Sequence, residues 1–167
     1  AEGPISGTEY MTHHNLRGSV WTYLFRKEIL HDLRFPKGVL HEDEAFTPQI
    51  MLRVDNLYTT KNKAYYYRKR ENSIMHKRDK RWYIRRLADA EQVIYRLKDR
   101  VDYLPVKERI AMERRIAQLT MDHIYNVITM THDETHLDHV LQRLSRHGLF
   151  PLPDKDYTTK YKWFRRM

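Results

Sequence analysis

The segment Phe35-Pro36-Lys37-Gly38-Val39-Leu40-His41-Glu42-Asp43-Glu44 places a Pro/Gly turn directly before three consecutive acidic residues. Carboxylates are favoured in the first turn of a helix, because the unpaired N–H groups and the helix dipole attract them. Apolar residues then recur at helical spacing at Phe46, Ile50, Met51 and Val54. The pattern predicts a helix that starts at the acids. The three carboxylates therefore act either as a helix start or as a chemical site.

The residues on either side of this helix give weaker signals. Residues 1–16 show no clear period and predict a loop. Residues 20–30 carry apolar side chains at helical spacing, which predicts an amphipathic helix that ends before Phe35. Residues 57–60 and 64–67 are rich in β-branched and aromatic residues, so we expect two short strands joined by residues 61–63.

From about residue 79 onward the pattern is helical. Two long apolar series are separated by Pro105, which predicts an antiparallel helical hairpin: Ile84, Leu87, Ile94, Leu97 and Val101 in the first, and Val106, Ile110, Ala117, Met121, Ile124 and Ile128 in the second. A third helix is expected from Thr135, ending at Gly148. The expected fold class is α+β and mostly helical.

Composition limits the class of protein. Hydrophobic residues make up 41% and aromatic residues 12% of the 167 positions, which is enough for a folded core. The chain has no cysteine, and no apolar run approaches the roughly 18 residues that a membrane span needs. These features favour a cytoplasmic protein. The net charge of +9 is concentrated in residues 61–86, which hold eleven Lys/Arg against only Glu71 and Asp79.

Several linked motifs resemble the C-terminal half of the catalytic domain in bacterial inverting glycosyltransferases of family 2, which have the GT-A fold. The resemblance covers roughly residues 17–76. It rests on Gly-Ser-Val-Trp at 18–21, Leu-Phe-Arg-Lys-Glu-Ile-Leu at 24–30, Arg-Phe-Pro at 34–36, Glu-Asp-Glu at 42–44 and Tyr-Tyr-Tyr-Arg-Lys-Arg-Glu-Asn-Ser-Ile-Met at 65–75.

The resemblance implies separate catalytic and binding roles for these residues. Asp43 is expected to be the general base that takes the proton from the acceptor hydroxyl, with Glu42 beside it. Trp21 and Glu44 are expected to bind the acceptor, although Thr22 stands where the family usually has a small polar residue such as Asn. We expect the donor diphosphate to be contacted by Arg70, Ser73 and His76.

The resemblance also implies a larger enzyme. The family carries an upstream nucleotide-binding half whose Asp-x-Asp motif holds a divalent cation, Mn²⁺ or Mg²⁺, and residues 1–40 contain no such motif. We therefore expect a fragment that is inactive alone. Its expected partners are a nucleotide-sugar donor and a glycan or lipid-linked acceptor. The expected parts are the acceptor side of the catalytic domain (1–76), a helical appendage (77–153) and a basic aromatic tail (154–167).

Two further sequence patterns concern a possible metal site and possible membrane contact. His132, His136 and His139 are spaced to share a helix face, but nothing completes a metal site, so no metal is expected in this chain. The tail from Lys160 to Met167 mixes cations with aromatic residues, which suits either peripheral contact with an anionic membrane at its inner face or docking on the helices.

A different class of function is also open. The basic segment 61–86 could serve a non-enzymatic helical module that binds nucleic acid or another polyanion. Nucleic acid is the less favoured partner, because no helix-turn-helix, zinc-finger or aromatic RNA-binding pattern is present. This alternative leaves the three acids as a helix start only.

Overall fold

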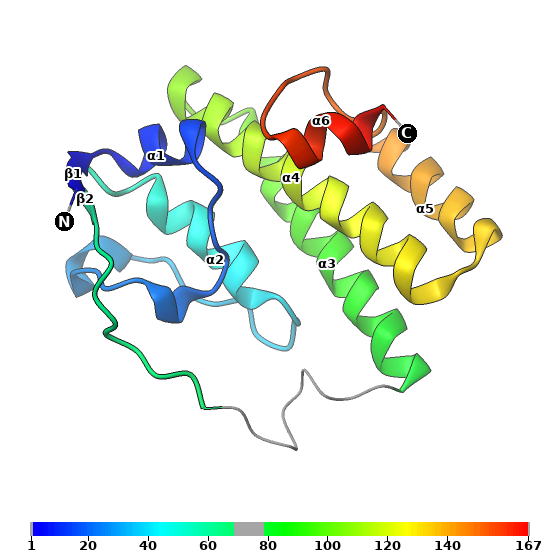
Figure 1. Cartoon of the computed structure of the whole chain (residues 1–167), viewed down its shortest axis with the longest axis horizontal. Coiled ribbons are helices and arrows are strands. Elements are labelled where there is room, and N and C mark those ends of the chain that lie inside the picture. Colours follow the sequence, from blue (N-terminus) through cyan, green and yellow to red (C-terminus); the bar gives the residue numbers. More distant parts are fainter. Residues whose placement is uncertain (1, 69–78, 167) are drawn as a thin grey trace.

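The computed structural model describes residues 2–68 and 79–166, and its path is shown in Figure 1. Within these residues it contains six α-helices, two 3₁₀ turns and one antiparallel sheet of two strands. The predicted class, α+β and mostly helical, is confirmed. None of the described helices combines the length with the apolar character that crossing a bilayer requires.

Three helices follow one another in the second half of the chain: α3 (Lys80–Val101), α4 (Val106–Thr131) and α5 (Glu134–Arg146). In Figure 1, α3 and α4 lie side by side and α5 packs on the other side of α4. The predicted hairpin is confirmed, with Pro105 immediately before α4. The third helix is confirmed as well, although Asp133 rather than Thr135 caps it by accepting a hydrogen bond from the His136 N–H at 3.0 Å.

The three acids do start a helix, α2 (Glu42–Met51). It packs against α3, and Ala45 belongs to the same buried apolar cluster as Leu87 of α3. A second cluster joins Met11 and Leu16 to Ala111 of α4. These contacts cross the predicted boundary at residue 76, and the division into parts stays a prediction.

Residues 1–16 are not the predicted loop. They form strand β1 (Glu2–Ile5) and helix α1 (Gly7–His13), and the Ser6 side chain caps α1 by accepting a hydrogen bond from the Glu9 N–H at 3.1 Å. A partner distant in sequence stabilises this segment. β1 pairs with strand β2 (Leu57–Thr59), and α1 packs on α4.

The prediction of a helix over 20–30 was wrong. The structure has two 3₁₀ turns, η1 (Val20–Thr22) and η2 (Lys27–Leu30), separated by extended residues. Tyr23 leaves η1 in an extended conformation, with its hydroxyl donating to the Arg17 carbonyl at 2.8 Å. Leu24, expected on the apolar face, is 94% exposed. The apolar periodicity therefore does not reflect one buried helix face.

The prediction of paired strands was half right. β2 covers 57–59, but its partner is β1 and residues 64–67 do not form a strand. Instead, the rings of Tyr65 and Tyr67 pack on Trp21, at 5.0 and 5.2 Å between centroids. Side-chain stacking thus takes the place of the expected strand pairing.

The tail forms helix α6 (Thr159–Arg165), which lies on α4 (Figure 1). Tyr161 is fully buried and donates its hydroxyl to the Pro153 carbonyl at 3.1 Å; burial raises its pKa to about 12. Trp163 is 67% exposed. The tail is therefore docked on the helices, and membrane contact stays a prediction.

Candidate functional site

The first turn of α2 presents the three carboxylates. His41 precedes the turn in the left-handed region, with φ of 65°, and Glu42, Asp43 and Glu44 follow as its first helical residues. The Asp43 Oδ1 atom accepts a hydrogen bond from the Glu44 N–H at 2.9 Å. The carboxylates therefore do stabilise a helix N-terminus.

Glu44 differs from its two neighbours because its carboxylate is paired with a residue of another helix. Arg115 of α4 forms an ion pair with Glu44 and donates a second hydrogen bond to the Leu16 carbonyl at 2.8 Å. Burial raises the pKa of Glu44, and the Arg115 guanidinium opposes that rise. The chain passes close by at Gly18, where an added Cβ would lie 2.2 Å from the Glu44 carboxyl carbon. Glu44 is thus held in place by groups from two other segments.

Asp43 is half-buried and Glu42 is exposed. Among the described residues, neither takes part in an ion pair, and the bond from the Glu44 N–H is the one hydrogen bond of the Asp43 side chain. Asp43 Oδ2 therefore has free acceptor capacity. A carboxylate of this kind can take a proton from a hydroxyl that comes within hydrogen-bond distance.

Trp21 lies in η1, which packs against α2. Just before η1, the Gly18 carbonyl accepts a hydrogen bond from the Thr47 hydroxyl of α2 at 2.6 Å. Trp21 is 43% exposed, and with Tyr65 and Tyr67 it forms a partly exposed aromatic cluster. The structure therefore brings two predicted elements, the acids and Trp21, to neighbouring segments.

The predicted donor-binding residues Arg70, Ser73 and His76 lie outside the described residues. Within 2–68 and 79–166, no group of three or more His, Asp or Glu side chains is placed to hold a metal ion. The sequence has one Asp-x-Asp pattern, at 154–156, and both of its carboxylates pair with α6, Asp154 with Arg165 and Asp156 with Lys162. These two aspartates therefore hold the segment before α6 against that helix.

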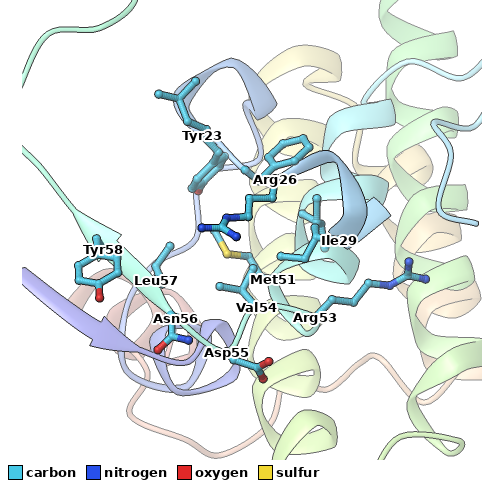
Figure 2. Close-up of a pocket in the computed structure, with 13 residues that line it drawn as sticks. Tyr23, Arg26, Ile29, Met51, Arg53, Val54, Asp55, Asn56, Leu57 and Tyr58 are labelled. Atoms are coloured by element: carbon cyan, nitrogen blue, oxygen red, sulfur yellow. The ribbon is translucent and has the colours of Figure 1, made fainter. Parts of the chain in front are cut away.

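A cavity of about 790 Å³ opens between the η1–η2 segment, the end of α2 and strand β2. Figure 2 shows the Arg26 side chain within it and Arg53 at its edge. Arg53 donates to the Leu30 carbonyl at 2.6 Å and pairs with Asp32 at 3.0 Å, so it fastens η2 to α2. Of the predicted site residues that the structure describes, Trp21, Glu42, Asp43 and Glu44, none lines this cavity.

Comparison with protein-family models, curated proteins and solved structures finds no match for this chain.

Sequence reasoning missed the residues that support the acids. Arg115 lies 71 positions from Glu44. A helical pattern does not indicate with which distant carboxylate a buried arginine forms an ion pair. Tyr65 and Tyr67 lie in a segment for which the sequence pattern predicts a strand. Their spacing of two did contain a signal, since alternate residues of an extended segment point to the same side, and here both contact Trp21.

Proposed function

We propose that this chain supplies the acceptor side of an inverting, family 2-like glycosyltransferase, together with a nucleotide-binding portion upstream. Asp43 is the general base. The observation that carries the proposal is the contrast within the acid cluster. Arg115 anchors Glu44, whereas Asp43 in the same helical turn keeps an oxygen without a protein partner among the described residues.

The reaction is a single displacement at the anomeric carbon. The acceptor hydroxyl gives its proton to Asp43 as its oxygen bonds to that carbon, and the bond from the carbon to the diphosphate breaks on the opposite side. The nucleoside diphosphate leaves with the bonding electron pair, and the configuration inverts. A positioned carboxylate typically contributes a factor of about 10² to 10⁴ to such a proton transfer.

The other residues of the site have supporting roles in this proposal. Aromatic faces bind the apolar faces of sugars, and the cluster of Trp21, Tyr65 and Tyr67 offers such a face next to α2. Glu42 is exposed and lies beside the base. Arg70, Ser73 and His76 approach the donor diphosphate, and the divalent cation belongs to the upstream portion.

The test is nucleotide-sugar turnover by the full-length gene product, with a panel of UDP and GDP donors in the presence of Mn²⁺ or Mg²⁺. Asp43→Asn keeps an oxygen that can accept the bond from the Glu44 N–H, so the variant is expected to fold normally. Its turnover is expected to fall by about two orders of magnitude or more. Asp138→Asn, an exposed change on α5, is the matched control. Turnover by Asp43→Asn at the level of this control would overturn the proposal.

A further inference from the structure

A second cavity, of about 350 Å³, lies between α3 and α4 and reaches the start of α2 and helix α6. Its size falls within the range of small-molecule sites. Its apolar lining comes from two helices, and Leu87, Val93 and Ile94 of α3 are buried there. His41 and Glu44 also line it, so a ligand in this cavity contacts the helical turn that carries Asp43.

His123 of α4 is the most buried polar side chain of the lining, at 3% exposure. Within the described residues neither ring nitrogen makes a hydrogen bond, although Nε2 lies 3.5 Å from Glu91 Oε2. Buried polar groups in native proteins nearly always have a partner, so an imidazole in this state at a cavity wall indicates a polar ligand group. Asn126, one helical turn further along α4, adds an amide to the same wall.

Among the described residues that line the cavity, one cationic side chain has no acidic partner. Glu44 pairs with Arg115, and Asp122 pairs with Lys160 at 2.8 Å. Arg86 donates from Nε to His41 Nε2 at 3.3 Å, and the pKa of His41 is lowered by burial and by this guanidinium.

An imidazole carries no negative charge, so His41 does not compensate the charge of Arg86. Among residues 2–68 and 79–166, no carboxylate lies within ion-pair distance of Arg86. The neighbouring Arg85, by contrast, meets Asp89 at 3.7 Å. Arginine is well suited to bind a carboxylate or phosphate through two parallel hydrogen bonds.

We propose that this cavity binds a saccharide that carries an anionic group. Arg86 holds the carboxylate or phosphate, and His123 and Asn126 hydrogen-bond the sugar hydroxyls. The inference deepens the proposed function and rests on it, because it identifies this saccharide as part of the acceptor. The proposal that the cavity binds this saccharide depends only on the residues that line the cavity.

The test is direct binding, followed by calorimetry or by ligand-observed NMR. The probes are glucuronate and a hexose phosphate, with glucose, acetate and inorganic phosphate for comparison. At least one of the anionic sugars is expected to bind saturably, about tenfold or more tightly than glucose or the corresponding free anion, because a charge-assisted hydrogen bond adds to the hydroxyl contacts.

Two adjacent arginines provide a matched pair of variants. Arg86→Gln is expected to weaken binding of the anionic sugar about tenfold, whereas Arg85→Gln, outside the cavity, is expected to change it less than twofold. Asn126→Ala is expected to weaken binding of the anionic sugar without affecting inorganic phosphate. Absence of saturable binding, equal weakening by both arginine changes, or equally tight binding of the free anions would overturn the proposal.

This test does not depend on turnover, so the two proposals can fail separately. Asp43→Asn is expected to bind the sugar as the unchanged protein does. Binding without any donor turnover by the full-length product would support the cavity and overturn the acceptor role together with the proposed function.

Discussion

Arg115, in the middle of α4, holds the carboxylate of Glu44 on the first turn of α2. This contact fixes the acid cluster against the long helical hairpin. Arg115→Met is expected to destabilise the protein by about 3 kcal/mol, because it leaves Glu44 partly buried without its cation and the Leu16 carbonyl without a donor. Chemical denaturation measures the loss. Arg96→Met, an exposed change on α3, is the control, and an equal loss in both variants would contradict the role of the pair.

Glu91 is a buried carboxylate that joins α3 to α5. It accepts two bonds from Arg143, at 2.7 and 2.8 Å, and one from the Tyr95 hydroxyl at 2.5 Å. Burial alone would raise the pKa of Glu91, but the bonds from Arg143 and Tyr95 prevail and hold it well below the usual 4.5.

A depressed carboxyl pKa adds stability that is present above the unfolded-state pKa and is lost as the pH falls below it. Glu91→Gln is therefore expected to cost about 3 kcal/mol at pH 7, with the difference from the unchanged protein shrinking below pH 4.5. Urea unfolding across pH gives the curve, with the exposed Glu134→Gln as control. A difference that stays constant down to low pH would contradict this assignment.

Gly7 marks the closest approach between α1 and the end of α2. An added Cβ would lie 2.0 Å from the Met51 carbonyl oxygen, and the Gly7 N–H donates to the Val54 carbonyl at 2.8 Å. Backbone must move to admit a methyl group, so Gly7→Ala is expected to cost about 2 kcal/mol or more. Gly148→Ala, at φ of 65° in open space, is expected to cost about 1 kcal/mol. Thermal unfolding compares the two, and a smaller loss at Gly7 would argue against this close contact.

Trp21 offers a kinetic test of the aromatic cluster. If the cluster binds the acceptor, Trp21→Ala in the full-length product raises the KM for acceptor severalfold and changes the KM for donor little, since only acceptor contacts are removed. Tyr65→Ala shifts the same constant in the same direction, and Tyr103→Ala, 88% exposed on the far helical hairpin, leaves it unchanged. Equal effects on both Michaelis constants would instead indicate a general loss of structure.

The sequence predicted the parts of the fold that depend on local pattern. The periodicities of α3, α4 and α5 run over several turns, and the centre of each predicted face in α3 and α4 is buried, as at Leu97 and Met121. Positions nearer the helix ends are exposed: Ile84 in α3, and Val106, Ile110 and Ile128 in α4. The start of α2 at the acids follows from helix-end electrostatics, which is equally local.

The errors concern segments whose conformation depends on distant partners. β1 pairs with β2 about 55 positions away, and the residues that lead into η1 bind α2 through the hydrogen bond between Thr47 and Gly18. The same distinction between local and long-range features applies to the candidate site. Its acids could be identified from their order along the chain, whereas Arg115, Tyr65 and the cavity beside His123 arise only when the helices pack.

The docking of α6 changes how the tail can be studied. Tyr161 is fully buried and Lys160 contributes to the cavity beside His123, so removing the tail would damage the helical core and a candidate binding site at once. Trp163 is exposed on the same helix, and Trp163→Ala can probe membrane contact without that damage. Although its composition resembles that of a mobile basic terminus, this short segment is part of the folded core and lines a cavity. Changes along it must be interpreted one side chain at a time.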